Sequence, residues 1–256
     1  MEGQEIDALL ALCRTGSAEE QCRAIVDLEE MRALEAVPVL LGLVSSRDEG
    51  VRANVAVALG KLGSCESVTP ALLSLLEDPE ALVRVNAVQS LGDLRCTECA
   101  PRLRQVLTSD PEPLVRLQAA ETLGTLKDRA ALPSMMSALR DPDEGVRAQA
   151  AEALGQLGEH VAIPELSTLL ATERSPLGRA SLLGALYQLG DETALALLLD
   201  EVEGVDDQTA ATVLNLAVEV IRPQDVDLLR WRLKSLVRSR QTLTAEAESL
   251  LRRLGP

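Results

Sequence analysis

Apolar and polar positions in the central part of the chain follow a pattern that returns about every thirty-one residues. The clearest copy runs from Asp141 to Gly158: a turn at Asp-Pro-Asp, then Val-Arg, then alanines and leucines at helical spacing, and a closing glycine. In an earlier copy Val83, Ala87 and Leu91 are four residues apart, which places them on one face of a helix. A unit that returns in this way indicates a stack of similar supersecondary elements.

Two columns of residues predict two helices in each period. A proline opens a short apolar helix, which we call helix A; proline suits the first helical turn, where its missing N–H costs nothing. A Val-Arg pair lies near the start of a longer helix, which we call helix B. The prolines are Pro38, Pro70, Pro101, Pro133 and Pro164, and the arginines are Arg52, Arg84, Arg116, Arg147 and Arg179.

A single pair of apolar helices cannot bury both faces, so neighbouring pairs must complete the core. The sequence therefore predicts an all-α solenoid of about eight antiparallel helix pairs, one domain over residues 1–256. Residues 1–35 are expected to form a capping repeat, 36–190 five regular repeats, and 191–256 divergent repeats with a C-terminal cap. A column of glycines inside helix B, where glycine costs about 1 kcal/mol relative to alanine, indicates that a helix of the next repeat crosses there: Gly60, Gly92, Gly124 and Gly155.

The pattern Asp-Pro-x-x-x-Val-Arg-x-x-Ala-x-x-x-Leu-Gly-x-Leu resembles HEAT repeats, in particular the short HEAT-like repeats of phycobilisome lyase subunits. The resemblance implies a right-handed curved stack whose inner surface is lined by helices B. It also implies that the Asp and Arg columns bridge adjacent repeats as a ladder, with Asp78, Asp110 and Asp141 as its acids. We expect exposed links of this ladder to contribute about 0–1 kcal/mol each.

The charge narrows the possible partners. The chain has 25 basic and 40 acidic residues, a net charge of −15, which argues against a nucleic-acid binder. Residues 222–256 are the exception, with eight basic and four acidic residues. An acidic body with a basic end is expected to pair internally, to self-associate or to bind a basic partner. Trp231 lies in this region, on either a membrane-surface helix or a capping helix; the capping helix is favoured.

No apolar run is long enough to span a bilayer, and the start of the chain shows no signal peptide. The five cysteines have no framework spacing and fit a reducing cytoplasm. Cys96 and Cys99 form a CxxC motif, and Cys65 falls in the loop column of Cys96, so a redox or metal cluster is conceivable. Because no fourth zinc ligand is evident and Cys99 replaces a small buried residue, a structural role is favoured.

Nothing in the sequence forms a catalytic set. His160 is the only histidine, so the multi-histidine iron site of deoxyhypusine hydroxylase is not possible, and no cofactor or metal is expected. The better candidate site is a stripe of amides and carboxylates along helices B, which can bond to a peptide backbone or to basic side chains. A merely solvated face is the equally weighted alternative. The stripe consists of Asn54, Asn86, Gln89, Asp93, Gln118, Glu121, Gln149, Glu152 and Gln156.

Val85 and Leu117 stand beside this stripe, where most copies have alanine, and form either an apolar anchor or additional core. Together these features predict a non-catalytic adaptor or regulatory scaffold in the cytoplasm that binds another protein on its concave helix-B surface. The resemblance suggests an alternative, an accessory subunit of a bilin-chromophore lyase. A nucleic-acid binder that uses Arg230 to Arg240 is the third hypothesis, opposed by the acidic charge.

Overall fold

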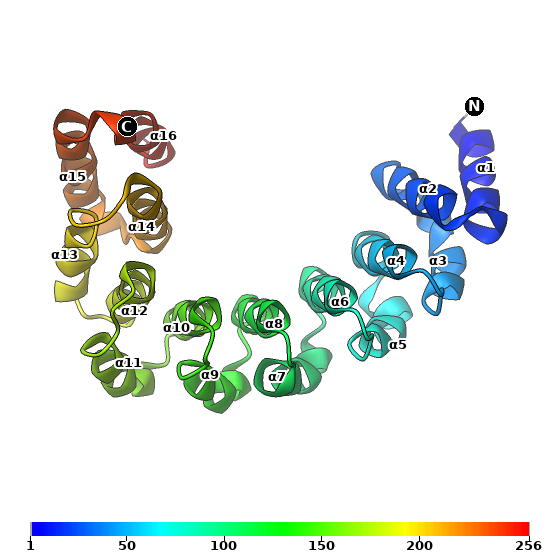
Figure 1. The fold of residues 1–256 in the computed structure, drawn as a ribbon, viewed down its shortest axis with the longest axis horizontal. Coiled ribbons are helices and arrows are strands. Elements are labelled where there is room, and N and C mark those ends of the chain that lie inside the picture. Colours follow the sequence, from blue (N-terminus) through cyan, green and yellow to red (C-terminus); the bar gives the residue numbers. More distant parts are fainter. Residues whose placement is uncertain (1, 256) are drawn as a thin grey trace. The chain divides into compact units, whose positions relative to one another are not determined.

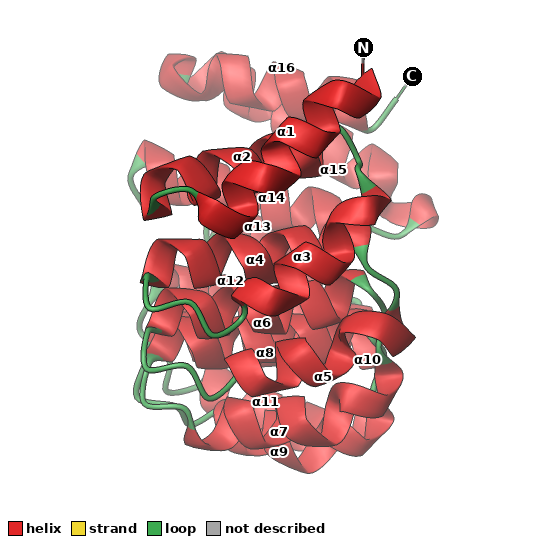
Figure 2. Cartoon of the chain, turned by 90° about the vertical axis from the view of Figure 1, so that its right-hand side faces the viewer, coloured by secondary structure: helices red, strands yellow, loops and turns green. Residues whose placement is uncertain are grey.

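The computed structural model describes residues 2–255, and within this range the chain forms sixteen α-helices, short 3-10 turns and no strand (Figures 1 and 2). The expected all-helical architecture of antiparallel helix pairs is confirmed. The right-handed sense of the stack stays a prediction. The residues group into two compact units, Met1–Ser134 and Met135–Pro256.

The first unit contains four helix pairs, in which helices with odd numbers are helices A and helices with even numbers are helices B. Within this unit the helices B form one layer on the concave side of its curve, and the helices A form the other layer (Figure 1). The helices are α1 (Glu2–Thr15), α2 (Ala18–Glu30), α3 (Val37–Leu43), α4 (Glu49–Leu62), α5 (Cys65–Leu75), α6 (Ala81–Asp93), α7 (Ala100–Ser109) and α8 (Pro113–Thr125).

The second unit follows the same arrangement. Helix α9 (Leu132–Ala138) contains the boundary between the two units. The C-terminal part from Thr193 to Arg253 forms two further helix pairs. The remaining helices are α10 (Glu144–Leu157), α11 (Ile163–Leu170), α12 (Pro176–Gln188), α13 (Thr193–Asp200), α14 (Asp207–Val220), α15 (Val226–Ser239) and α16 (Thr244–Arg253).

Local sequence signals define where helices B begin and end. Asp48 and Asp143 cap α4 and α10, and each carboxylate accepts a hydrogen bond from the backbone N–H three residues later, at 3.0 and 3.1 Å. Gly158 follows α10 in the left-handed region at φ 70°, and Arg95 adopts a similar conformation after α6 at φ 53°. A residue in this conformation turns the chain sharply toward the next helix A.

One expected helix start is wrong. Pro70 does not open its helix but lies inside α5, which begins at Cys65. Ser64 and Ser67 form reciprocal capping bonds that start the helix five residues before the proline. As a result Cys65, expected in a loop, is the first residue of a helix.

Candidate protein-binding surface

An ion-pair ladder joins consecutive helices B to the turns that follow them. Arg84 in α6 donates from Nε and Nη2 to the two carboxylate oxygens of Asp110, both at 2.8 Å. Arg52 pairs with Asp78 in the same way, at 2.6 and 2.9 Å. In the second unit glutamates take the place of aspartate, in Arg147–Glu173 at 3.4 Å and Arg179–Glu201 at 2.7 Å. The ladder predicted from the resemblance is therefore present in both units.

The expectation that the links of this ladder are exposed is wrong for the first unit. The side chains of Arg84 and Asp110 are only 9% and 6% exposed. Arg84 Nη1 also donates to the backbone oxygen of Asp78 at 2.8 Å. The arginine therefore bonds both to the backbone of the turn in its own repeat and to the carboxylate in the turn of the next repeat. Burial alone would raise the pKa of Asp78, but the hydrogen bonds from Arg52 and the Glu80 amide outweigh it and hold that pKa below its usual value.

The glycine column is a place of close helix contact, as predicted. A Cβ at Gly60 would lie 2.5 Å from the Cβ of Ser90, and a Cβ at Gly92 would lie 2.9 Å from Thr122 Cγ2. In the second unit a Cβ at Gly155 would lie 3.0 Å from the Cα of Ala185. Helices B thus approach one another too closely for any side chain at these positions, and this approach fixes the spacing of the face they present.

Four amide residues of the stripe, Asn54, Asn86, Gln118 and Gln149, are half-buried, and two of them bond to the preceding repeat. Asn86 Nδ2 donates to the backbone oxygen of Ala53 at 3.1 Å, and Asn54 Nδ2 lies 3.5 Å from the backbone oxygen of Cys22. Gln118 Nε2 donates to Glu121 Oε2 at 3.1 Å. Asn54 and Asn86 therefore orient consecutive helices, which the sequence pattern did not reveal.

The outer part of the stripe in the first unit is open to solvent. Gln89, Asp93 and Glu121 are exposed, and together with Gln118 and Thr125 they line a shallow polar cavity of about 140 Å³ between α6 and α8. Within the described residues neither Asp93 nor Glu121 takes part in an ion pair. Two carboxylates without a cationic partner thus stand beside side-chain amides on this face.

The same two helices carry exposed leucines one or two turns earlier. Leu82 is 64% exposed and Leu114 is 70% exposed, at equivalent positions of α6 and α8. Val85 and Leu117 follow three residues later and are half-buried, so each pair lies on one helical face. Leu82 and Leu114 therefore lie beside the two residues that were considered from the sequence as either an apolar anchor or additional core. Both leucines stand two positions before the arginine of their repeat, and this shared position was the feature of the sequence that could have identified them.

In the second unit much of the stripe is engaged internally. Gln149 and Glu152 are half-buried, and the hydroxyl of the buried Ser181 donates to Glu152 Oε1 at 3.1 Å. Gln156 is exposed. Alanine and glycine occupy the positions that correspond to the leucines and valine of α6 and α8, apart from Leu177. The stripe residues of the two units are thus not equivalent, and the first unit holds the more accessible set.

The basic C-terminal residues are largely used inside the second unit. Arg232 contacts Glu203 at 2.5 Å and Asp200 at 3.5 Å, and Arg240 pairs with Asp207 and donates to the backbone oxygen of Val202 at 2.9 Å. Internal pairing, one of the three expectations for this region, is confirmed. Trp231 is exposed beside Lys234 on α15, whose buried face includes Leu229 and Leu233.

Two of the five cysteines are joined to each other, a pairing that their spacing in the sequence did not predict. Cys65 and Cys96 form a disulfide between consecutive repeats, with their Cα atoms 5.7 Å apart. Cys99 is a buried free thiol, as its small-residue column predicts. Glu98 lies beside the disulfide, a neighbour that spacing alone did not identify. His160 is exposed, and its Nδ1 lies 3.1 Å from the backbone oxygen of Gly158.

Among residues 2–255, the helices are too short or too polar for any of them to span a bilayer. No curated protein matches the sequence. Solved structures do resemble the chain: the complex of CpcE and CpcF of phycocyanin lyase from Nostoc sp. PCC7120 shares 24% identity at a TM-score of 0.63, over 85% of this chain and 94% of that chain.

Two further structures share the fold. The Escherichia coli protein YIBA has 18% identity and a TM-score of 0.59, over 96% of this chain and 92% of that one. Kap121p bound to Pho4p has 15% identity and a TM-score of 0.60, over 98% of this chain and 33% of that one. The sequence model of HEAT repeats matches residues 6–92, 69–138, 100–187 and 137–222. The chain belongs to the HEAT-repeat family.

Proposed function

We propose that this chain is a non-catalytic adaptor or regulatory scaffold that binds a partner protein on the concave face of its helices B. The observation that carries the proposal is the face of α6 and α8, which combines Leu82 and Leu114 with Asp93 and Glu121. We call these four residues, with Val85, Gln89, Leu117 and Gln118 between them, the α6–α8 face.

The apolar end of this face supports burial by a partner. Two leucines more than 60% exposed, backed by Val85 and Leu117, form a cluster of a kind that is found where proteins meet. Such aliphatic contacts supply binding free energy when a partner covers them and excludes water. Leu82 and Leu114 are therefore the residues we expect to contribute most.

The polar end of the face supports a partner with basic or polar side chains. Among residues 2–255 neither Asp93 nor Glu121 forms an ion pair, and the chain as a whole carries a net charge of −15. The amides of Gln89 and Gln118 can both donate and accept hydrogen bonds. A helix or extended segment with apolar residues at one end and lysine or arginine at the other matches this order of groups.

Proteins of similar fold are seen in complexes with other proteins, namely CpcE with CpcF and Kap121p with Pho4p. Because these similarities concern the fold only, they support protein binding as the class of function but do not identify the partner of this chain. We place the scaffold in the cytoplasm because its five cysteines lack a framework spacing. Disulfides are rare in that compartment, so the Cys65–Cys96 pair is expected to be reduced there.

Affinity purification from the native cell, followed by mass spectrometry, tests this function. The variant Leu82→Asp with Leu114→Asp and the variant Asp93→Lys with Glu121→Lys should each recover a specific partner at least about tenfold less well than the unchanged chain. Leu197→Asp is the matched control, because Leu197 is 47% exposed on helix A α13. Equal recovery by all four proteins would exclude the α6–α8 face as the binding surface.

An accessory subunit of a bilin-chromophore lyase is the second candidate. Its support is the resemblance of the repeat pattern and of the fold to the phycocyanin lyase complex of CpcE and CpcF. This candidate predicts covalent bilin transfer to an acceptor protein when the chain is combined with a second lyase subunit, and none with either subunit alone. A native host without bilin pigments would rule it out.

A further inference from the structure

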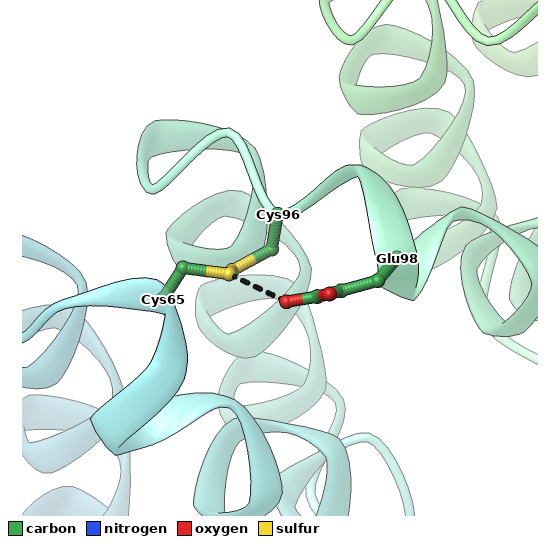
Figure 3. Close-up of side chains that lie close together, drawn as sticks. All are labelled: Cys65, Cys96 and Glu98. Carbon is green, nitrogen blue, oxygen red and sulfur yellow. Dashed lines mark hydrogen bonds between the residues drawn. A yellow bond between two sulfur atoms is a disulfide. The ribbon is translucent and has the colours of Figure 1, made fainter.

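Two cysteines and a glutamate from consecutive repeats meet at one edge of the first unit (Figure 3). Cys65 is the first residue of α5, Cys96 precedes the 3-10 turn that leads to α7, and Glu98 lies in that turn. Glu98 Oε1 is 3.1 Å from Cys65 Sγ, and one oxygen and the two sulfurs all lie within 4.8 Å of one another.

The carboxylate is directed at an atom that cannot satisfy it in the disulfide form. A disulfide sulfur carries no hydrogen, so Cys65 Sγ has no proton to donate to Glu98. Glu98 also forms no ion pair within the described residues. Reduced thiols or a cation between the three groups would each give this carboxylate a partner.

The donor set suits a thiophilic divalent cation. Zn²⁺ binds thiolates at about 2.3 Å and carboxylate oxygens at about 2.0–2.2 Å, which in a tetrahedral site places ligand atoms roughly 3.5–3.8 Å apart. The separation of 5.7 Å between the Cα atoms of Cys65 and Cys96 allows a disulfide and leaves room for the two sulfurs to swing apart after reduction. Catalytic zinc sites commonly have three protein ligands and a water molecule.

The surroundings favour the anionic ligands. Cys65 lies at the N-terminus of a helix, where the helix dipole stabilises a thiolate. Thr69 Oγ1 donates to the Cys65 carbonyl at 2.5 Å and lies 3.2 Å from Cys96 Sγ, so it holds the backbone of one ligand against the side chain of the other. Cys99 is a buried free thiol and does not belong to the group of ligand atoms that lie within 4.8 Å of one another.

We propose that Cys65, Cys96 and Glu98 bind one Zn²⁺ or a similar thiophilic divalent cation when the disulfide is reduced. A dithiol reductant supplies two electrons and two protons, breaks the S–S bond and becomes a disulfide itself. Metal binding then displaces the two thiol protons, and water completes the coordination. The disulfide and the metal are alternative cross-links between the same two repeats. A disulfide oxidant that accepts two electrons from the two thiolates re-forms the S–S bond, takes up two protons to become a dithiol and releases the cation.

Titration of the whole chain with Co²⁺ tests this site, since thiolate ligands give cobalt a charge-transfer absorption in the near ultraviolet. After reduction and removal of the reductant under anaerobic conditions, the unchanged protein should bind one Co²⁺ with this absorption, and Zn²⁺ should displace it. Cys65→Ser and Cys96→Ser should each abolish the band, and Glu98→Gln should weaken binding at least about tenfold. The oxidised protein should show no band.

Cys22→Ser is the matched control, because Cys22 is a partly exposed free thiol of α2 outside the cluster. It should bind Co²⁺ like the unchanged chain. Circular dichroism of each variant checks that the helices are intact. A reduced, folded protein without the charge-transfer band would overturn the proposal, and so would a band that persists in Cys65→Ser or disappears in Cys22→Ser.

Discussion

Arg84 reaches across a repeat to Asp110 with two parallel hydrogen bonds of 2.8 Å, while its third nitrogen closes the turn of its own repeat at the Asp78 backbone oxygen. This bidentate contact is nearly buried. One side chain therefore satisfies a turn and joins it to the next one, which makes the arginine column a structural part of the stack and leaves binding to the exposed face of the same helices.

Loss of this arginine should destabilise the protein strongly. Arg84→Met leaves Asp110 without its cation in a site where both side chains are buried, and breaking a buried pair typically costs about 3–5 kcal/mol. Urea unfolding followed by circular dichroism measures the loss. Arg23→Met is the control, since Arg23 forms an exposed pair with Glu19, and it should change the free energy of unfolding by less than about 1 kcal/mol.

Alanine at Gly60 should destabilise the first unit although alanine is the better helix former. Its Cβ would lie 2.5 Å from the Cβ of Ser90 and 3.0 Å from the Cα of Ser90, so α6 must move away. We expect a loss of about 1–3 kcal/mol, typical of overpacking. Gly42→Ala in α3 meets nothing within 4 Å and should instead stabilise by about 0.5–1 kcal/mol. Thermal unfolding measures the change in stability of both variants. Equal changes for Gly60→Ala and Gly42→Ala would contradict the close approach of α4 and α6 at Gly60.

Stability should fall in acid because of Asp78. The pKa of Asp78 is lower in the folded protein than in the unfolded chain, where it is about 3.9. The contribution of Asp78 to the free energy of unfolding is therefore fully present above about pH 4, and it is lost as the pH falls through the lower pKa that Asp78 has in the folded protein. Asp78→Asn should be less stable at neutral pH but lose less stability between pH 5 and 3, values chosen to bracket about 3.9. Urea unfolding of both proteins over this pH range measures the difference, and equal slopes against pH would contradict the role of Asp78.

The disulfide should stabilise the oxidised protein. It closes a loop with a sequence separation of 31, for which the chain-entropy model gives a stabilisation of about 2–4 kcal/mol. Cys65→Ser should lower the free energy of unfolding by this amount under oxidising conditions, and a reductant should remove most of the difference. Guanidinium unfolding with and without reductant measures both effects. If Cys22→Ser gave the same loss, the disulfide would not be its cause.

The periodic sequence was sufficient to predict the helix pairs and much of their detail. The prolines and the Val-Arg pairs identified helices A and B, and the glycines at 60 and 92 correctly indicated where the next helix crosses. Helix pairs continue in the degenerate end of the chain, where α14 spans Asp207–Val220. These features depend on residues close together in the chain, where the helical repeat determines which side chains share a face.

Contacts between repeats were decided by the tertiary structure. Asn86 bonds to the preceding helix, Ser181 engages Glu152, and Glu98 meets Cys65, although equivalent spacing in the sequence did not distinguish these residues from their solvent-exposed counterparts. The offset and rotation between stacked helices determine which atoms meet across a repeat, and these depend on the packing of all the side chains at once. The sequence alone determined that the chain repeats and where its helices lie; only the three-dimensional packing determined which of the repeated side chains are used in holding the stack together and which, like Leu82 and Leu114, stay exposed.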